Sequence, residues 1–221
     1  MTDSNPSADL NREGGAWPLV HSERAVLAAD LADISDGQWA TQSLCSDLTV
    51  RQVLAHLTAG ARLNSVGWLA GVIRCRFDFD KQVAMRLTEQ MGASPGETLE
   101  RFRHVVPSTT KPPLPVIAML GETIVHGEDI RRPLGIRRDH PIETVTRVAD
   151  YYRGSDLVVP AKGRVHGLRL VAQDGPFTTG AGPLVSGTTL ALVMAMTGRS
   201  TYLDELEGDG VDLLRERCAT A

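Results

Sequence analysis

"PVIAMLGETIVHGEDIRRPLG", residues 115–135, decides the fold of this chain. On a helix, which turns by about 100° per residue, the apolar side chains of its first half form a stripe with apolar flanks: Val116, Ile117, Ala118, Met119, Leu120, Ile124 and Val125. A helix that is apolar nearly all round is buried among other helices. We therefore expect a long helix that crosses the interior of the protein and ends at Gly135, since glycine is a common helix stop.

Glu122 and His126 lie four residues apart on this helix, and so on one face of it. The spacing alone is a weak signal, because an exposed pair of this kind is an ordinary helix contact that contributes about 0.3 kcal/mol. Burial changes the interpretation, since a buried carboxylate is costly unless it meets a cation, a proton or a metal. Gly121 and Gly127 beside the pair would let a neighbouring backbone approach closely.

A second helix, expected from Thr49 to about Arg74, carries a third polar candidate, His56. The helix start is well marked, because Thr49 with Gln52 three residues later has the pattern of a capping box. His56 lies at the edge of the apolar stripe of this helix, where a histidine is often a satisfied core residue. If a bundle brings it against Glu122 and His126, two histidines and one carboxylate form a common catalytic-zinc ligand set with one open position.

The remaining segments predict a helical first part and a mixed second part. Further helices are expected over about residues 19–34, 78–91, 94–106 and 141–154. After Gly154, one segment alternates apolar and polar residues as a strand does, one is rich in glycine and threonine, and two favour helix: residues 163–174, 175–187, 188–199 and 208–218. We expect a partly disordered lead-in over residues 1–18, a metal-binding helical bundle over 19–155 and a small α/β domain over 156–221.

Composition excludes several classes of function. The net charge of −4 gives no electrostatic support for nucleic-acid binding. The apolar run at residues 190–196 is too short to span a bilayer, and the polar N-terminus lacks the order of a signal peptide. We expect a cytoplasmic protein, monomer or homodimer, that binds neither nucleic acid nor membrane. Cys45, Cys75 and Cys218 are scattered, which favours buried or idle thiols over a disulfide framework.

Two motifs resemble the mycothiol-dependent maleylpyruvate isomerase family, part of the DinB-like metalloenzyme superfamily: "LTVRQVLAHLTAG" at residues 48–60 and "GETIVHGEDIRRPLG" at residues 121–135. The resemblance implies a mainly α fold, a DinB-like up-and-down bundle with a small α/β C-terminal domain. It places His56, Glu122 and His126 on the family's three metal-ligand positions. "ALVMAMTGRS" at residues 191–200 and the "GDG" that follows are similar to the family's small C-terminal domain.

The leading hypothesis for function is a thiol-dependent metalloenzyme. A divalent metal, with zinc favoured by the ligand set, would bind the sulfur of a small thiol, for which the resemblance implies mycothiol. Metal coordination deprotonates a thiol that is otherwise mostly protonated at neutral pH. The thiolate would then attack a small electrophile, as in an S-transferase or an isomerase. Two alternatives stay open: a non-catalytic metal- or ligand-binding regulatory protein, and a metal-dependent hydrolase that uses zinc-bound hydroxide.

Asp129 is a weaker candidate on the same long helix. It lies on roughly the same face as Glu122 and is expected to accept an N–H from a ligand histidine, which would orient the ring. The structural alternative is a salt bridge to Arg131 or Arg132.

Asn64 and Arg199 are the remaining candidates. Asn64, two turns beyond His56 on the expected helix, would orient a water or satisfy a helix contact. Arg199 would hold a carboxylate of the cofactor or substrate with two parallel hydrogen bonds. Its structural alternative is a cation at the C-terminus of a helix.

Overall fold

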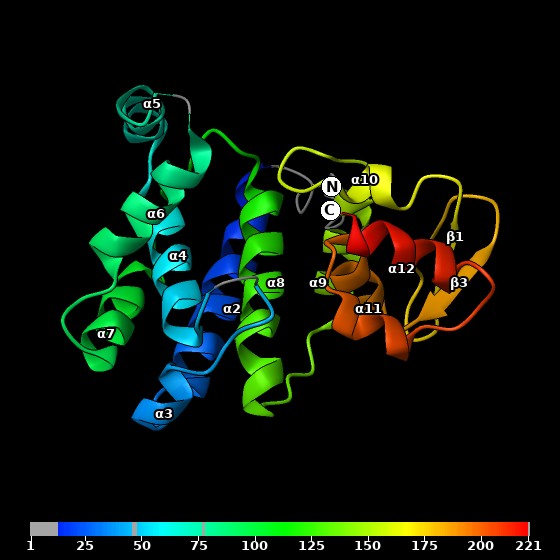
Figure 1. Ribbon diagram of the computed structural model, residues 1–221, viewed down its shortest axis with the longest axis horizontal. Coiled ribbons are helices and arrows are strands. Elements are labelled where there is room, and N and C mark those ends of the chain that lie inside the picture. The colour runs from blue at the N-terminus through cyan, green and yellow to red at the C-terminus, as the bar shows by residue number, and fades with distance from the viewer. Residues whose placement is uncertain (1–12, 46–47, 77, 221) are drawn as a thin grey trace, which may run out of the picture. The chain divides into compact units, whose positions relative to one another are not determined.

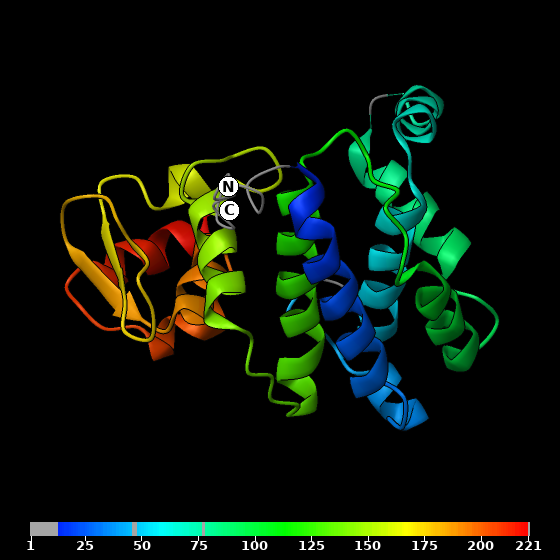
Figure 2. The ribbon, with the colours of Figure 1, turned by 180° about the vertical axis from the view of Figure 1, so that it is seen from behind.

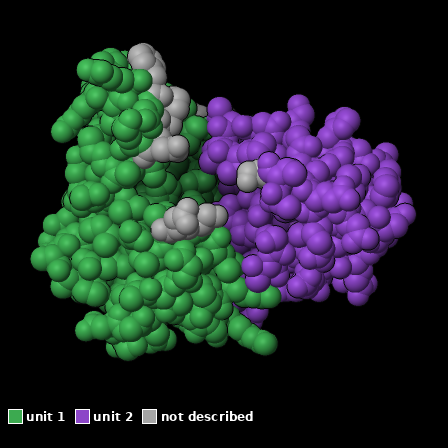
Figure 3. Space-filling view, in the orientation of Figure 1, with its two compact units in different colours: residues 1–137 green, residues 138–221 purple. Residues whose placement is uncertain are grey.

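The chain folds into two compact units, Met1–Arg137 and Arg138–Ala221, which Figure 3 colours separately. The computed structural model describes residues 13–45, 48–76 and 78–220. The first unit is helical, and the second combines helices with a three-stranded sheet (Figure 1). The expectation of a mainly α fold with a small α/β C-terminal part is confirmed.

The first unit is a bundle in which α2, α4 and α8 run side by side, as Figures 1 and 2 both show. α4 also packs against α6 and α7, and α2 against α7. The described helices of this unit are η1 (Glu13–Ala16), α2 (Trp17–Asp30), α3 (Asp36–Trp39), α4 (Val50–Arg62), α5 (Ser65–Arg74), α6 (Phe79–Gln90), α7 (Pro95–Val105) and α8 (Val116–Leu134).

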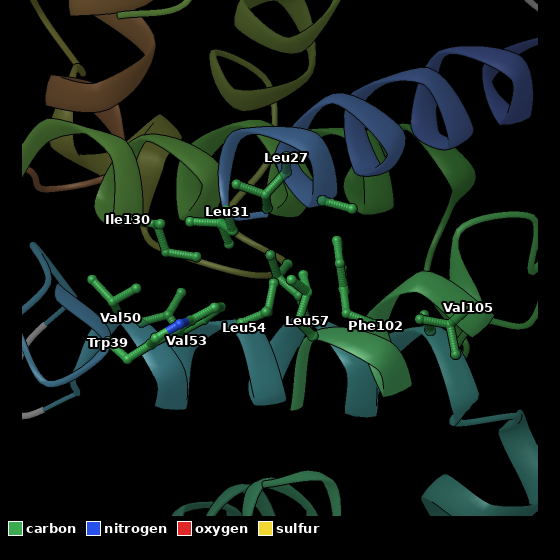
Figure 4. Packing of buried hydrophobic residues seen from close by; sticks show 13 residues of the cluster. Leu27, Leu31, Trp39, Val50, Val53, Leu54, Leu57, Phe102, Val105 and Ile130 are labelled. Carbon is green, nitrogen blue, oxygen red and sulfur yellow. The ribbon is translucent and has the colours of Figure 1, made fainter. Parts of the chain in front are cut away.

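The core of the bundle lies where α2, α3, α4, α7 and α8 meet, and their apolar side chains point toward one another in Figure 4. Its buried members are Leu27, Ala28, Leu31, Trp39, Val50, Val53, Leu54, Leu57, Ala61, Leu99, Phe102, Val105 and Ile130. α8 is buried on nearly all sides over its first half, as its apolar sequence predicts. It ends at Gly135, whose φ of 70° is the left-handed conformation of a helix C-cap.

The N-terminal expectation needs a partial correction. Residues 1–12 of the expected lead-in lie outside the described residues. Glu13–Ala16 form η1, and α2 already begins at Trp17, so residues 13–18 are helical. Pro18 occupies the first turn of α2, where its missing N–H costs nothing.

α4, the helix of His56, begins as the sequence predicts. The hydroxyl of Thr49 accepts the backbone N–H of Gln52, and the Gln52 side chain accepts the backbone N–H of Thr49 at 2.8 Å. This reciprocal capping box satisfies two of the amide groups that a helix start leaves unpaired. It also fixes the register of α4, and therefore the face on which His56 lies.

Arg51, next to the cap, ties the first turn of α4 to its neighbours. Its Nε donates to the hydroxyl of Thr98 on α7 at 2.9 Å. Its Nη2 donates to the carbonyls of Met91 and Gly92, each at 2.9 Å. The planar guanidinium thus supplies hydrogen bonds to two carbonyl groups of the loop between α6 and α7 and holds this loop against α4.

The second unit contains α9 (Ile142–Tyr152), α10 (Ala161–Arg164), β1 (Arg169–Ala172), β2 (Thr178–Thr179), β3 (Leu184–Gly187), α11 (Thr189–Met196), η2 (Ser200–Glu205) and α12 (Val211–Ala219). β1 is the central strand, antiparallel to β2 and parallel to β3. Leu170 of β1 and Val185 of β3 are register partners, and both are fully buried.

The division between the units falls after Arg137, earlier than the boundary after residue 155 that we expected. The difference concerns α9, which packs against α11 of the second unit. Its buried apolar face includes Val145 and Val148, and this face explains the grouping. No helix among the described residues is long and apolar enough to cross a membrane.

Replacing Arg51 with lysine should lower the free energy of unfolding by about 2 kcal/mol, because the donors of an ammonium share one nitrogen and cannot match the spacing of Nε and Nη2. Urea unfolding of the metal-free protein measures the change. Arg62→Lys on the same helix is the matched control, since Arg62 is exposed and its Nη1 bonds the Gln90 side chain at 3.1 Å. Equal losses in the two variants would contradict the assigned role of Arg51.

Candidate metal centre

The structure brings His56, Glu122 and His126 together from two helices. His56 on α4 places Nε2 3.8 Å from Oε2 of Glu122 on α8, and His126 places its own Nε2 3.4 Å from the same oxygen. The two imidazole rings meet edge to face with centroids 5.0 Å apart. Single ligand atoms of the three residues all lie within 4.8 Å of one another.

These separations suit three ligands of one ion better than a chain of hydrogen bonds. Two atoms that each bind zinc at about 2.1 Å in a tetrahedron lie about 3.4 Å apart. An N–H···O bond is shorter, typically about 2.9 Å. Two imidazole nitrogens and one carboxylate oxygen are also the donor types that zinc takes in catalytic sites. The residues present therefore fit a divalent metal.

The site is partly open, because the side chains of His56 and Glu122 retain 29% and 19% of their exposure. The side chain of His126 is more deeply placed, at 10%. A small molecule that approaches from solvent therefore meets the His56 and Glu122 side of the cluster first.

Electrostatics holds Glu122 and His126 in charged forms in the absence of a metal. Burial favours the neutral carboxyl of Glu122, but the imidazoles of His126 and His56 outweigh it and hold the pKa of Glu122 well below its usual range. Burial also disfavours the imidazolium of His126, yet hydrogen bonds with Asp129, Cys45 and Glu122 raise the pKa of His126 well above its ordinary value. A carboxylate thus faces the position that a cation would take.

Asp129 contacts the far edge of the His126 ring. Its Oδ2 lies 2.9 Å from Nδ1 of His126, and its side chain is fully buried. This is the contact expected of a carboxylate that accepts an N–H from a ligand histidine. A proton on Nδ1 leaves the lone pair of His126 on Nε2, the nitrogen that faces Glu122. Arg131, one of the two alternative partners, bonds Asp30 at 2.8 Å through its Nε.

Gly127 has a role that differs from the one we expected. A Cβ at this position would lie 2.8 Å from Nη1 of Arg131, whose side chain is buried. The glycine therefore makes room for a guanidinium of its own helix rather than for a neighbouring backbone. The same guanidinium lies 3.5 Å from Oε1 of Glu128 through Nη1, so the C-terminal half of α8 buries a charge network beside the apolar first half.

Asn64 does not lie on the helix of His56, so its expected position two turns beyond His56 on that helix is wrong. α4 ends at Arg62, and the Asn64 side chain accepts the N–H of Gly67 at 2.8 Å as the exposed N-cap of α5. Asparagine is among the best N-cap residues because its short side chain reaches the free amides of the first turn. The helix expected to continue to Arg74 is therefore two helices.

Arg199 lies in the second unit, immediately after α11. Its backbone N–H donates to the carbonyl of Met194, and its Nη1 donates to the carbonyl of Thr197 at 2.8 Å. These contacts are those of a cation at a helix C-terminus, where carbonyl groups gather. Its binding of a cofactor or substrate carboxylate stays a prediction.

Cys45 is the site residue that sequence reasoning missed. Its thiol forms a second ligand cluster with His126 and Asp129, although the residue lies 81 positions from His126 in a loop with no recognisable motif. Cys45, Cys75 and Cys218 are free, half-buried thiols. Burial raises the pKa of Cys218, which suits an unreactive thiol.

Comparisons with known proteins point to one family. Residues 20–112 match the profile of the mycothiol maleylpyruvate isomerase N-terminal domain. Two solved structures, of the mycothiol-dependent maleylpyruvate isomerase and of a histidine-to-alanine mutant, are similar with a TM-score of 0.62. Each is 14% identical, over 93% of this chain and 96% of that chain. A comparison with curated proteins gave no significant match.

These matches differ in what they show. At 14% identity the solved structures show the fold alone. The profile match covers α4 with His56 and ends before α8. The profile match confirms the family resemblance over residues 20–112, which include the first of the two sequence motifs, and the second motif lies beyond its end.

Asp129→Asn should lower the free energy of unfolding of the metal-free protein by about 3 kcal/mol, because a buried imidazolium loses its anionic partner. Thermal or urea unfolding in the presence of a chelator measures the change. Asp150→Asn removes an exposed pair with Arg153 and should cost less than about 0.5 kcal/mol. A small, equal effect in both variants would show that Asp129 does not hold a charged His126.

Proposed function

We propose, on the premise that residues 20–112 carry the N-terminal domain of the mycothiol maleylpyruvate isomerase family, that this protein is a metal-dependent enzyme that uses a small thiol. The observation that carries the proposal is the approach of His56 and His126 to the same oxygen of Glu122, at 3.8 and 3.4 Å. Zinc is the ion that this donor set favours, and mycothiol is the thiol that the family indicates. The reaction is an S-transfer to a small electrophile or an isomerisation through a thiol adduct.

The residues of the chain would hold the metal, orient its histidine ligand and leave one side of the site open. His56, Glu122 and His126 would hold the metal, and the bound metal would supply the Lewis acidity that deprotonates a thiol near neutral pH. Asp129 keeps the proton of His126 on Nδ1 and so directs Nε2 toward Glu122. The partial exposure of His56 and Glu122 leaves a side from which thiol and electrophile approach.

The hydrolase alternative needs a general base beside the open position of the metal. Asp129, the further carboxylate that we placed near the metal ligands, is fully buried and bonded to Nδ1 of His126. A carboxylate that orients a histidine ring in this way is not placed to take a proton from water at the open side. The non-catalytic binding protein remains the second candidate, because the same three side chains would hold a metal without turnover.

Purified protein should hold about one divalent ion per chain, with zinc favoured. In a Cys45→Ser background, which removes the thiol of the second ligand cluster, His56→Ala and His126→Ala should each lose most of it while far-UV circular dichroism stays helical. Glu122→Gln should weaken binding because it removes the charge and keeps the shape. Metal mass spectrometry after dialysis measures the content.

The matched control is His104→Ala, which removes an exposed histidine on α7 whose Nδ1 lies 2.7 Å from the carbonyl of Glu100. This variant should keep full metal content. If His56→Ala and His126→Ala also keep full metal content, the assignment of the site is wrong.

The zinc-loaded protein should consume a small electrophile near pH 7 when mycothiol is added, and Glu122→Ala should reduce the rate to background. Michael acceptors and epoxides form the test panel, and loss of free thiol or of substrate absorbance is the readout. Turnover of an ester or amide with no thiol present would instead establish the hydrolase. A tightly held metal with no thiol-dependent turnover across the panel would favour the binding protein.

A further inference from the structure

Cys45 is held against α8 by a backbone contact that a proline creates. Pro133 lies inside α8 and has no N–H, so the carbonyl of Asp129, four residues earlier, loses its helical donor. The backbone N–H of Leu44 takes that place at 3.0 Å. The hydroxyl of Ser43 accepts the N–H of Cys45 at 3.1 Å and thereby fixes the next residue.

This attachment gathers a second set of ligand atoms. One atom each of Cys45, His126 and Asp129 lies within 4.8 Å of the others. Asp129 is fully buried and meets the His126 ring at Nδ1, at 2.9 Å, whereas Glu122 meets it at Nε2, at 3.4 Å. The two ligand sets therefore use opposite edges of one imidazole ring.

We propose that Cys45, His126 and Asp129 form a second binding site, for a thiophilic divalent cation such as Zn²⁺ or Cd²⁺. A thiolate, an imidazole and a carboxylate are all zinc ligands, and water completes the tetrahedron. On binding, the thiol of Cys45 releases its proton to solvent. The His126 imidazolium of the metal-free chain also releases its Nδ1 proton to solvent, so that Nδ1 binds the cation. The proton on Nε2 stays and faces the carboxylate of Glu122.

The second site excludes the first, because both need His126. A neutral imidazole has one lone pair and one N–H, so it serves as ligand on one edge at a time. An ion bound at Cys45 uses His126 as a ligand, so His126 cannot bind an ion held by His56 and Glu122. An ion bound at His56 and Glu122 leaves Nδ1 of His126 protonated and bonded to Asp129. The chain therefore binds about one ion, at either of two positions. This inference goes beyond the proposed function and requires no turnover.

Cadmium titration of the full-length protein, without added thiol, tests the proposal, because a cadmium–thiolate bond has an ultraviolet charge-transfer band. His56→Ala is the decisive sample, since it disables the first site alone and should bind about one Cd²⁺ with the full thiolate band. Cys45→Ser should still bind about one Cd²⁺ through the first site, without the band. His126→Ala should raise the dissociation constant for Cd²⁺ at least about tenfold and show no band.

Cys75→Ser and Cys218→Ser are the matched thiol controls and should keep both the stoichiometry and the band. Absence of the band in His56→Ala overturns the proposal, as does a band that survives in Cys45→Ser or His126→Ala. Binding of two ions to the wild-type chain overturns the exclusion. Enzyme assays play no part in these outcomes, so the inference and the proposed function fail or stand separately.

Discussion

A carboxylate inside an apolar helix is the constraint on which the rest of the structure depends. Glu122 lies on the half of α8 whose other side chains are mostly buried and apolar, and its negative charge needs cationic or metal partners there. His126 meets it from the next turn of the same helix, but a second helix must supply His56. The capping box of α4 and the clamp of Arg51 hold that helix in register, so much of the bundle serves to complete one cluster.

The polar second half of α8 adds further charged contacts next to the cluster of Glu122, His126 and His56. Asp129 holds the far edge of the His126 ring, and Arg131 bonds Asp30 on α2. Pro133 frees the Asp129 carbonyl for the loop of Cys45. The helix thus presents His126 to two sets of partners, and the choice between them depends on which ring nitrogen carries the proton.

Local patterns with a direct physical cause were predictable from the sequence. The capping box at Thr49, the stop at Gly135 and the all-round burial of α8 follow from backbone amides, positive φ and apolar periodicity. The approach of His56 to α8 was predicted only from the family resemblance, because helical patterns alone do not say which helices become neighbours. Features that depend on tertiary contacts were not predictable. The break before Asn64 interrupts a continuous apolar pattern, and α9 joins the second unit by packing on α11. Cys45 lies near His126 because the backbone N–H of Leu44 bonds the carbonyl of Asp129, a contact that no side-chain pattern reveals.

X-ray absorption at the zinc edge tests the central claim most directly, with Cys45→Ser protein so that the second site contributes no sulfur. Zinc-loaded protein without thiol should show nitrogen and oxygen neighbours at about 2.0–2.1 Å and no sulfur. Addition of mycothiol should introduce one sulfur neighbour at about 2.3 Å, because the thiol takes the open position between His56, Glu122 and His126. A spectrum that mycothiol leaves unchanged, or a protein that holds no zinc, would contradict the account.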